Sequence, residues 1–345
     1  MIKKKIAAAM LAAMLVLGGG CGSSDVSTNS DTPKILCAAF AEYDWTRQIL
    51  GENPGGLDLQ LLNESGMDMH SYQPSVADMV KIADADLMIF TGGDSEFWIE
   101  DALESSQSEH RTHVEIMEIF EHNHKLADRY TADEHDDHDH DEHDDHDGHG
   151  HDHEPAGDEA GHDGHVHSTD EHLWLSLKMA PAFIGQIAES IAELDPDNAD
   201  YYEANASTYI DKIRKLDAHF ENSVCDSGHK TILFADRYPF KYLLEDYGLA
   251  HVAAFPGCSA ETEASFETIL TLSETVDTLG LDTVIVLHKS KPDLAYTVIN
   301  NSANPGAHVL ELNSMQSVTA KDIDGGAAWL DIMEENIEAL TKALN

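Results

Sequence analysis

Residues 195–220 read DPDNADYYEANASTYIDKIRKLDAHF, and after Pro196 neither Gly nor Pro interrupts them. Asp195 suits the N-cap of a helix, and Pro196 suits its first helical position. The apolar residues that follow recur at intervals compatible with one helix face: Tyr202, Tyr209, Ile213 and Leu216. About 25 residues at about 1.5 Å each would form a rod of about 37 Å. The spacing therefore predicts one long helix, which we place at residues 195–222.

Short apolar segments alternate with helical patterns on both sides of this helix. The predicted strands are 34–40, 57–62, 87–91 and 114–120 before it, and 231–235, 252–255, 284–287 and 309–312 after it. The predicted helices are 45–50, 75–83, 97–104, 176–194, 240–247, 266–279, 293–300 and 328–344. Such alternation is typical of βαβ units, and mainly apolar strands are typical of parallel sheets covered on both faces.

These elements predict an α/β fold with two lobes, each a mainly parallel sheet flanked by helices, joined by the long linking helix. The alternative is that the long helix lies on the surface of one lobe. We divide the chain into a lipoprotein signal peptide (1–21), a flexible tether (22–33), an N-terminal α/β lobe (34–132), a disordered loop rich in His and Asp (133–171), a helix re-entering the first lobe (172–194), the linking helix (195–222) and a C-terminal α/β lobe (229–345).

The N-terminus indicates export. Three lysines at positions 3–5 precede an apolar run at 6–17, which is too short to span a bilayer and suits a signal peptide. Small residues then lead to Cys21, as in a bacterial lipoprotein signal, so Cys21 is expected to carry a lipid anchored in the membrane. The alternative is an ordinary cleaved signal peptide. Both place the mature chain outside the cytoplasm, at the cell surface or the periplasmic face.

Charge and cysteine content exclude some classes of protein. The chain carries 20 basic and 65 acidic residues, a formal net charge of −45, which argues against nucleic acid as a partner. Beyond Cys21 there are three cysteines, and an odd number cannot form a complete disulfide framework. Cys225 and Cys258 are one candidate bridge. The other interpretation is three buried thiols, which includes Cys37.

One segment is dominated by histidine and acid. Residues 133–167 contain eleven histidines and fifteen Asp or Glu, with no Lys or Arg, so they cannot form a packed core. Neutral imidazole and carboxylate groups are ligands for ions such as Zn²⁺. We therefore expect an auxiliary, low-affinity metal loop. Its histidines are His135, His138, His140, His143, His146, His149, His151, His153, His162, His165 and His167.

Two histidines outside that run are candidates for a fixed metal site. His70 lies in MDMHSYQP (67–74), between a predicted strand and a helix, where ligands of open α/β sheets are found. His172 lies in EHLWLS (171–176), where the chain regains apolar character after the histidine-rich loop. The alternatives are that His70 is an ordinary surface histidine and that His172 is only the last of the loop's histidines.

These contexts resemble the two histidine motifs of the ZnuA/TroA-type solute-binding proteins of bacterial metal ABC importers. Around the first, Tyr72, Pro74 and Asp78 match that family, although Met69 stands where proline is common. Around the second, Leu177 replaces the usual proline. Further matches are Gly93, Glu96, Trp98, Asp195, Pro196, Tyr202, Asn205, Tyr209, Leu216, Phe240, Tyr242, Tyr247 and Gly248. The resemblance covers residues 34–345, and a histidine-rich loop is typical of the zinc-importing members.

The second lobe departs from the family pattern. Where the family usually supplies a third ligand, this chain has Arg237, which cannot coordinate a cation, and we expect the adjacent Asp236 to take that place. The alternative is that Asp236 pairs with Arg237. For the fourth ligand we favour His288, which follows a predicted strand, over Cys258. Asn313, near the family's usual acid, offers only an amide.

The resemblance implies a capture protein that binds Zn²⁺, with Mn²⁺ less favoured, and delivers the ion to an ABC permease driven by its ATPase. Two imidazoles favour zinc over manganese, which prefers more oxygen ligands, although a further acidic ligand keeps Mn²⁺ open. We expect a monomer and no enzyme, since no His-Glu-x-x-His, Gly-x-Ser-x-Gly or glycine-rich phosphate motif is present. A metal-storage or adhesin lipoprotein is the other class considered.

Overall fold

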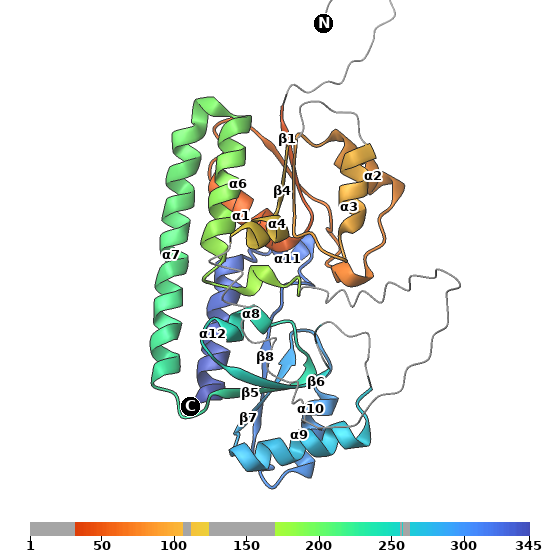
Figure 1. The fold of residues 1–345 in the computed structure, drawn as a ribbon, viewed down its shortest axis with the longest axis vertical. Helices are drawn as coiled ribbons and strands as arrows, with labels where there is room; N and C mark the ends of the chain where they lie inside the picture. Colours follow the sequence, from red (N-terminus) through yellow and green to blue (C-terminus); the bar gives the residue numbers. More distant parts are fainter. Residues whose placement is uncertain (1–31, 106–111, 124–169, 256, 258–262) are drawn as a thin grey trace, which may run out of the picture. The chain divides into compact units, whose positions relative to one another are not determined.

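The computed structural model describes residues 32–105, 112–123, 170–255, 257 and 263–345. The predictions for the signal peptide, Cys21, most of the tether, the eleven loop histidines and Cys258 lie outside these residues. Within them the chain forms two four-stranded parallel sheets with helices on their faces (Figure 1). The predicted α/β fold with two lobes is therefore confirmed.

The first sheet has the strand order β2-β1-β3-β4, and all its pairings are parallel. Its strands are β1 (Lys34–Cys37), β2 (Asp58–Leu61), β3 (Leu87–Phe90) and β4 (Thr112–Glu115). The helices of this lobe are α1 (Phe40–Leu50), α2 (Val76–Asp84), α3 (Phe97–Ser105), α4 (Ile116–His122) and α6 (Ala180–Leu194). All four residues of β3 are buried, as expected for a strand covered on both faces.

The second sheet repeats this order as β6-β5-β7-β8, again with parallel pairings. Its strands are β5 (Thr231–Arg237), β6 (Ala250–Phe255), β7 (Thr283–Leu287) and β8 (His308–Leu312). The helices that follow in this half are α8 (Lys241–Glu245), α9 (Phe266–Leu279), α10 (Asp293–Asn301), α11 (Ala320–Asp324) and α12 (Trp329–Leu344). In both sheets the strand order reverses beside the first strand, and ligands of such sheets bind outside the carboxyl ends at that point.

The linking helix is α7 (Ala199–Cys225), 27 residues long, or about 40 Å at about 1.5 Å per residue. It packs along α1 and α6 of the first lobe and along α12, which packs on the second sheet. A surface helix of one lobe would not make both sets of contacts. In Figure 1 α7 runs beside α6 and α12.

The start of the linking helix differs from the prediction. A short 3-10 turn, Pro196–Asn198, precedes α7, and the Asp195 side chain makes no capping bond to the backbone. Instead, Asp195 Oδ2 accepts hydrogen bonds from Asn198 Nδ2 (2.8 Å) and Tyr202 Oη (2.7 Å). Asp195 therefore occupies the N-cap position of the 3-10 turn, but the predicted capping bond is wrong, because its carboxylate accepts from side chains of the turn and of α7 instead.

One hydrophobic core extends through both lobes. Alternate residues of each sheet face it, including Ile35 and Ile89 from the first sheet and Ile232 and Ile285 from the second. The opposite face of the first sheet packs against α2 and α3, and that of the second packs against α9 and α10. The shared core, with α7 and α12 lying along it, makes the two lobes one packed body.

Two other expectations are corrected. The predicted strand at 114–120 ends at Glu115, and residues 116–122 form α4, because Ile116, Met117 and Phe120 are buried at helical spacing. Cys225 is an exposed free thiol, so the prediction of three buried thiols is wrong for it, whereas Cys37 is buried. Burial raises the pKa of the Cys37 thiol well above its usual range.

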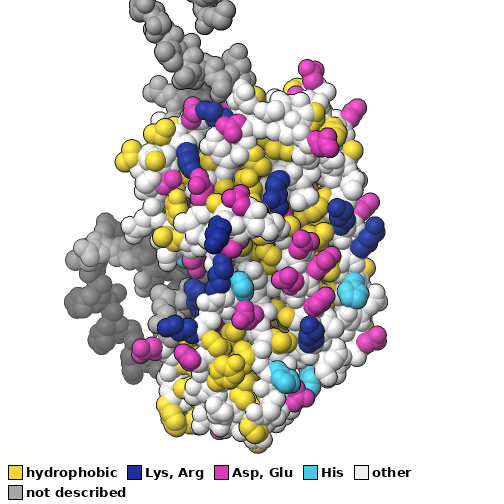
Figure 2. Space-filling view, turned by 180° about the vertical axis from the view of Figure 1, so that it is seen from behind, with side chains coloured by type: hydrophobic (Ala, Val, Ile, Leu, Met, Phe, Trp, Pro, Cys, Tyr) yellow, Lys and Arg dark blue, Asp and Glu magenta, His cyan; other side chains and the backbone are white. Residues whose placement is uncertain are grey.

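Surface charges are mixed on the face shown in Figure 2. Lys and Arg side chains lie among Asp and Glu side chains there, without forming an extended basic surface. None of the helices in the described ranges combines the length and apolar character needed to cross a bilayer.

Candidate metal centre

His70 lies in a short 3-10 turn, Met69–Ser71, that follows β2. Asp68 caps this turn, since its Oδ1 accepts the backbone N–H of His70 at 3.1 Å. The His70 side chain is 29% exposed, and its Nδ1 lies 2.5 Å from the hydroxyl of Ser95. The turn therefore holds this imidazole at the carboxyl end of the first sheet, against the loop that follows β3.

His172 is almost completely buried, with 2% of its surface exposed, at the start of the chain's re-entry into the first lobe. Its ring centroid lies 5.4 Å from that of His70. Its Nδ1 lies 2.8 Å from Asp170 Oδ1, which also accepts the His172 backbone N–H at 2.9 Å. The two candidate histidines, 102 positions apart in the chain (172 − 70), thus lie side by side.

Asp170 holds the buried ring in place. Burial alone would raise the pKa of this carboxyl, but its hydrogen bond to His172 and the nearby positive charges lower it overall. A ligand histidine commonly donates one ring N–H to a carboxylate and offers the other nitrogen to the metal. Asp170 on Nδ1 leaves Nε2 as the coordinating atom of His172 in such an arrangement. The Asp170 backbone carbonyl in turn accepts a hydrogen bond of 2.7 Å from the Tyr242 hydroxyl.

Glu171 lies between the two histidines and the loop after β3. Its Oε1 accepts the backbone N–H of Ser95 at 2.9 Å, and its Oε2 lies 3.6 Å from His70 Nδ1. Gly93 has a φ of +81°, and a Cβ built there would come within 2.7 Å of Glu171 Oε1. A residue with a side chain would be strained at this φ and would collide with the carboxylate, so the glycine makes room for it.

A buried carboxyl pair supports the same loop. Glu96 is 2% exposed, and its Oε2 accepts the backbone N–H groups of Thr91 (2.7 Å) and Gly92 (2.9 Å). Glu42 Oε1 accepts the Thr91 hydroxyl at 2.6 Å. Burial raises the pKa of both carboxyls, and the nearby Glu42 carboxylate raises that of Glu96 further. These bonds hold the backbone that leads into Ser95.

The second lobe meets this site through charged and polar contacts. The Arg237 guanidinium lies 3.3 Å from Asp68 Oδ2, and Gln316 Nε2 donates to Asp68 Oδ1 at 3.1 Å. The Trp174 indole N–H donates to the Ser314 carbonyl at 2.9 Å. The turn that carries His70 is therefore tied directly to β5 and to the segment after β8.

Asp236 and His288, the candidates from the second lobe, lie at the carboxyl ends of β5 and β7. Asp236 accepts backbone N–H groups with both oxygens, from Arg237 at 2.8 Å and from Leu287 at 3.1 Å. His288 is 42% exposed, and its Nδ1 lies 3.0 Å from Glu311 Oε2. The contacts that the structure shows for these two side chains are thus with their own lobe. The Arg237 guanidinium is paired with Asp68, whereas its backbone N–H is the group bonded to Asp236.

Asn313 is also engaged locally, because its Oδ1 accepts the Met315 backbone N–H at 2.8 Å. Across the part of the chain that the structure describes, no three His, Cys, Asp or Glu side chains already stand in coordinating positions around one point. The structure thus brings His70 and His172 together and leaves the remaining coordination to side chains that must move.

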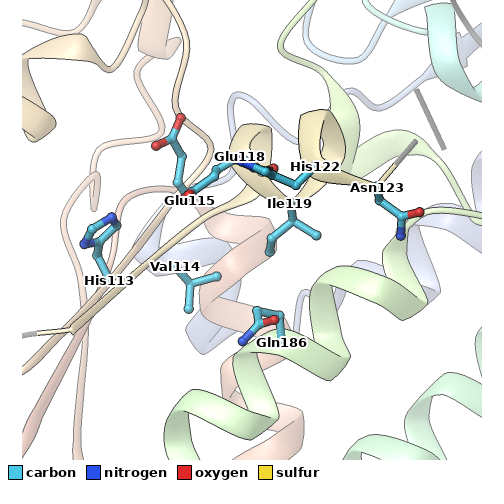
Figure 3. Close-up of a pocket in the computed structure, with 8 residues that line it drawn as sticks. All are labelled: His113, Val114, Glu115, Glu118, Ile119, His122, Asn123 and Gln186. Atoms are coloured by element: carbon cyan, nitrogen blue, oxygen red, sulfur yellow. Dashed lines mark hydrogen bonds between the residues drawn. The ribbon is translucent and has the colours of Figure 1, made fainter. Parts of the chain in front are cut away.

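A separate pocket of about 830 Å³ lies beside β4 and α4. Its lining includes His113, Glu115, His122 and Gln186. In Figure 3 the His113 ring and the Glu115 carboxylate point in different directions, and Gln186 projects from α6 across from them. These groups do not converge on a single point, so the pocket is not a second metal centre.

The sequence predictions missed the acids that surround the two histidines. The predicted boundaries include Asp170 and Glu171 in the acidic loop, and the prediction gives Asp68 no role beyond its place in the His70 motif. The available signal was their position beside the candidate ligands, because metal-binding histidines commonly donate their second ring N–H to a carboxylate.

A family model described as zinc-uptake complex component A, periplasmic, matches residues 35–343. The zinc-binding protein AdcA of Streptococcus pyogenes serotype M3 is 28% identical over 315 residues, which cover 89% of this chain and 55% of AdcA. This chain therefore spans about half the length of that relative. The high-affinity zinc uptake system protein ZnuA of Bacillus subtilis is 26% identical over 100% of this chain and 99% of its own.

Solved structures show the same fold. The metal-dependent lipoprotein YcdH of Bacillus subtilis matches 91% of this chain and 100% of its own, with a TM-score of 0.68 and 23% identity. The Zn(II)-bound ZnuA-like domain of Streptococcus pneumoniae AdcA matches 91% of this chain and 99% of its own, with a TM-score of 0.65 and 23% identity.

Proposed function

Because this chain belongs to the family of periplasmic zinc-uptake components, whose model matches residues 35–343, we propose that it captures Zn²⁺ outside the cytoplasm. It would then release the ion to an ABC-type importer. The observation that carries this proposal is the pairing of His70 with the buried His172 at the carboxyl end of the first sheet. The ion is cargo, and the protein performs no reaction on it.

The spacing of the two rings suits one zinc ion. A ring centre lies about 3.2 Å from a zinc ion bound to its nitrogen, since the Zn–N distance is about 2.1 Å. Two rings at the tetrahedral angle would then have centres about 5.2 Å apart. The centroids of His70 and His172 are 5.4 Å apart, so both imidazoles can reach one ion with small adjustments.

In this proposal the second lobe completes the site. Asp236 and His288 are the candidates, because both lie at the carboxyl ends of strands in the second sheet. Asp236 keeps lone pairs for a metal after accepting two N–H groups, since a carboxylate has about four acceptor positions. His288 would have to leave Glu311 and turn toward the first lobe. Either change requires a local movement at the lobe boundary.

We also propose partner proteins and a location for this chain. Relatives include a zinc uptake system protein and, in Streptococcus pneumoniae, a zinc-binding lipoprotein. We therefore propose an ABC permease with its ATPase as partner, a lipid on Cys21 as membrane anchor, and a monomer as the working form. We also propose the domain boundaries predicted from the sequence, with Asp170 and Glu171 moved to the first lobe and the linking helix at Ala199–Cys225. A weak metal-collecting role for residues 133–167 is part of the same proposal.

Substitution of each histidine tests this function. We expect His70→Ala and His172→Ala each to remove the tight Zn²⁺ site of the metal-stripped full chain in a titration against a competing chelator. His113→Ala is the matched control, because it removes an imidazole from the separate pocket, and its tight site should remain. Unchanged affinity in either of the first two variants would exclude that residue as a ligand.

The identity of the bound ion requires a separate measurement. Anomalous scattering from crystals grown with both metals, collected at the zinc and manganese edges, would show which ion occupies the site. We expect zinc, because nitrogen donors favour it over manganese. If only manganese occupies the site, the captured ion is Mn²⁺ and not Zn²⁺, and the capture role itself stands.

A further inference from the structure

Glu171 lies beside His70 at the candidate site, although it is neither of the two histidines nor a group of the second lobe. Its side chain is only 8% exposed, at the base of the site. The loop after β3 accommodates it, because Gly93 leaves space for the carboxylate and Ser95 donates a backbone N–H to Oε1. That bond fixes one oxygen and directs the other, Oε2, toward His70.

The distance from this second oxygen to His70 suits two ligands of one ion. Oε2 lies 3.6 Å from Nδ1 of His70, which is longer than a hydrogen bond. A nitrogen and an oxygen, each about 2.1 Å from a zinc ion and at the tetrahedral angle, are about 3.4 Å apart. The gap between Glu171 and His70 therefore has the width that a shared ion requires.

The three ligands Glu171, His70 and His172 together also fit the spacing of the two imidazole rings. His172 already lies within reach of an ion that also binds His70, and its Nδ1 is held by Asp170. Two neutral imidazoles and one carboxylate reduce the charge of a bound divalent ion from 2+ to 1+. A single carboxylate from the buried base of the site would thus lower the cost of taking the ion out of water.

Asp236 is less well placed to supply this carboxylate. Each of its oxygens accepts a backbone N–H, and one of these bonds, to Leu287, joins β5 to β7. Glu171, in contrast, uses one oxygen to hold the loop and turns the other toward the site. The neighbouring Arg237 is already paired with Asp68, so the second lobe brings a cation rather than an anion to this edge.

We infer that Glu171 coordinates the captured ion through Oε2, so that the first lobe supplies three ligands: His70, His172 and Glu171. This inference rests on the proposed function. Ser95, whose hydroxyl lies 2.5 Å from His70 Nδ1, gives up that contact when the ion binds there. One position of a tetrahedral ion then remains for the second lobe, where Asp236 or His288 would occupy it.

Glu171→Gln removes the charge and keeps the shape of the side chain. We expect this variant of the full chain to bind Zn²⁺ more than about 100-fold more weakly, a larger loss than the roughly 10- to 100-fold effect typical of a group that only hydrogen-bonds to a ligand. Glu115→Gln is the matched control. That carboxylate packs against Gly92 in the same loop, as Glu171 packs against Gly93, but it faces the separate pocket. Its zinc affinity should equal that of the wild type.

The zinc-bound crystal structure of the wild-type chain decides the role of Glu171. We expect a distance of about 2.0–2.2 Å between the ion and a Glu171 oxygen. A distance beyond about 3 Å would overturn the inference and leave Glu171 as a positioning residue for His70. The spectrum of the Co²⁺-loaded protein gives a second readout, because loss of a ligand in Glu171→Gln changes its d–d bands and loss of a positioning contact does not.

The inference and the proposed function fail in different ways. If His70→Ala and His172→Ala remove the tight site while Glu171→Gln keeps wild-type affinity, the capture role stands and the Glu171 ligand is excluded. If the two histidine variants keep the tight site, the proposed function itself is excluded. Circular dichroism of each metal-free variant confirms that it is folded, and Glu171→Asp provides a shorter carboxylate should the amide variant fail to fold.

Discussion

Asp170 controls the orientation of one buried ring. It accepts both the backbone N–H and the Nδ1 proton of His172, and its lowered pKa keeps it ionised near neutral pH. The hydrogen bond selects the tautomer that carries the proton on Nδ1, so the other nitrogen faces the ion. Asp170→Asn should therefore weaken zinc binding by about 10- to 100-fold, measured by competition with a chelator at fixed pH.

The control for this substitution is Asp84→Asn, which removes an exposed carboxylate at the end of α2, remote from both histidines in the fold. Its zinc affinity should match the wild type. Equal affinity of Asp170→Asn and the control would show that the ring is held by packing alone, for example by the neighbouring Trp174.

Glu115 should make stability depend on pH. Burial, with smaller contributions from Glu100, Glu118 and Glu121, raises its pKa from 4.5 to about 7. The folded state therefore holds a proton that the unfolded state has lost between these two values. By linkage this contribution to stability falls as pH rises from about 4.5 to about 7 and is constant above that range.

Glu115→Gln should remove that contribution. The melting temperature of the variant, relative to that of the wild type, should rise across this window and then stay level. Thermal melts at several pH values between 4 and 8 measure it. A difference that is constant over the whole range would mean that Glu115 titrates normally in the folded chain.

The candidate site could be predicted from the sequence only where a residue stands alone in an informative context. His70 and His172 could be predicted because each is a histidine at the border between apolar structure and a loop, and because the residues around both resemble the two histidine motifs of the ZnuA/TroA-type family. Glu171 and Asp170 were not found, because they continue an acidic run and nothing in their spacing separates them from it. The pairing of Arg237 with Asp68 joins positions 169 residues apart, and only the fold reveals such a contact.

At the scale of elements, hydrophobic runs predicted the sheets well, since the predicted strands correspond to β1–β3 and β5–β8 within a few residues. The failure at 114–120 has a physical cause. Val114 is a buried strand residue and Ile116 a buried helix residue, and the chain changes conformation between them without Gly or Pro to mark the change. Helix α1 likewise begins at Phe40, five positions before the predicted start at 45, with no capping side chain to signal it.

The histidine-rich segment can be tested as an element of its own. Many weak ligands would raise the total amount of zinc bound without contributing to the fixed site. Deletion of residues 133–167 should therefore lower the number of zinc ions bound per chain and leave one tight site with unchanged affinity. Equilibrium dialysis measures both quantities. Loss of the tight site on deletion would assign some of its ligands to this segment.

At the scale of the whole molecule, the hydrophobic core shared by both lobes should make the chain unfold in a single transition. Residues of both sheets pack with α7 in the same cluster, so neither lobe can expose its side of this shared core without the other. We expect the far-ultraviolet circular dichroism and the tryptophan fluorescence of the metal-free chain to change at the same urea concentration. Two separate transitions would show that the lobes unfold independently.

Ile213 provides the variant for this measurement. It is fully buried in α7 and belongs to the shared core. Ile213→Ala should destabilise the chain by about 2–5 kcal/mol while both signals still change together, because the loss is felt by the whole core. Lys212→Ala, at the neighbouring exposed position, is the control and should change stability by less than about 0.5 kcal/mol.

The junction between α12 and the first lobe affects when this protein can fold. Trp329, near the end of the chain, donates its backbone N–H to the buried Asp44 and its indole N–H to the Trp174 carbonyl, and its ring packs on Trp45. Until residue 329 has been synthesised, Asp44 has the Arg47 guanidinium but not the Trp329 backbone N–H as a donor, and Trp45 has Phe183 but not Trp329 as an aromatic neighbour. The first lobe, which is synthesised first, therefore gains its full set of native contacts only after the last helix of the chain has been synthesised.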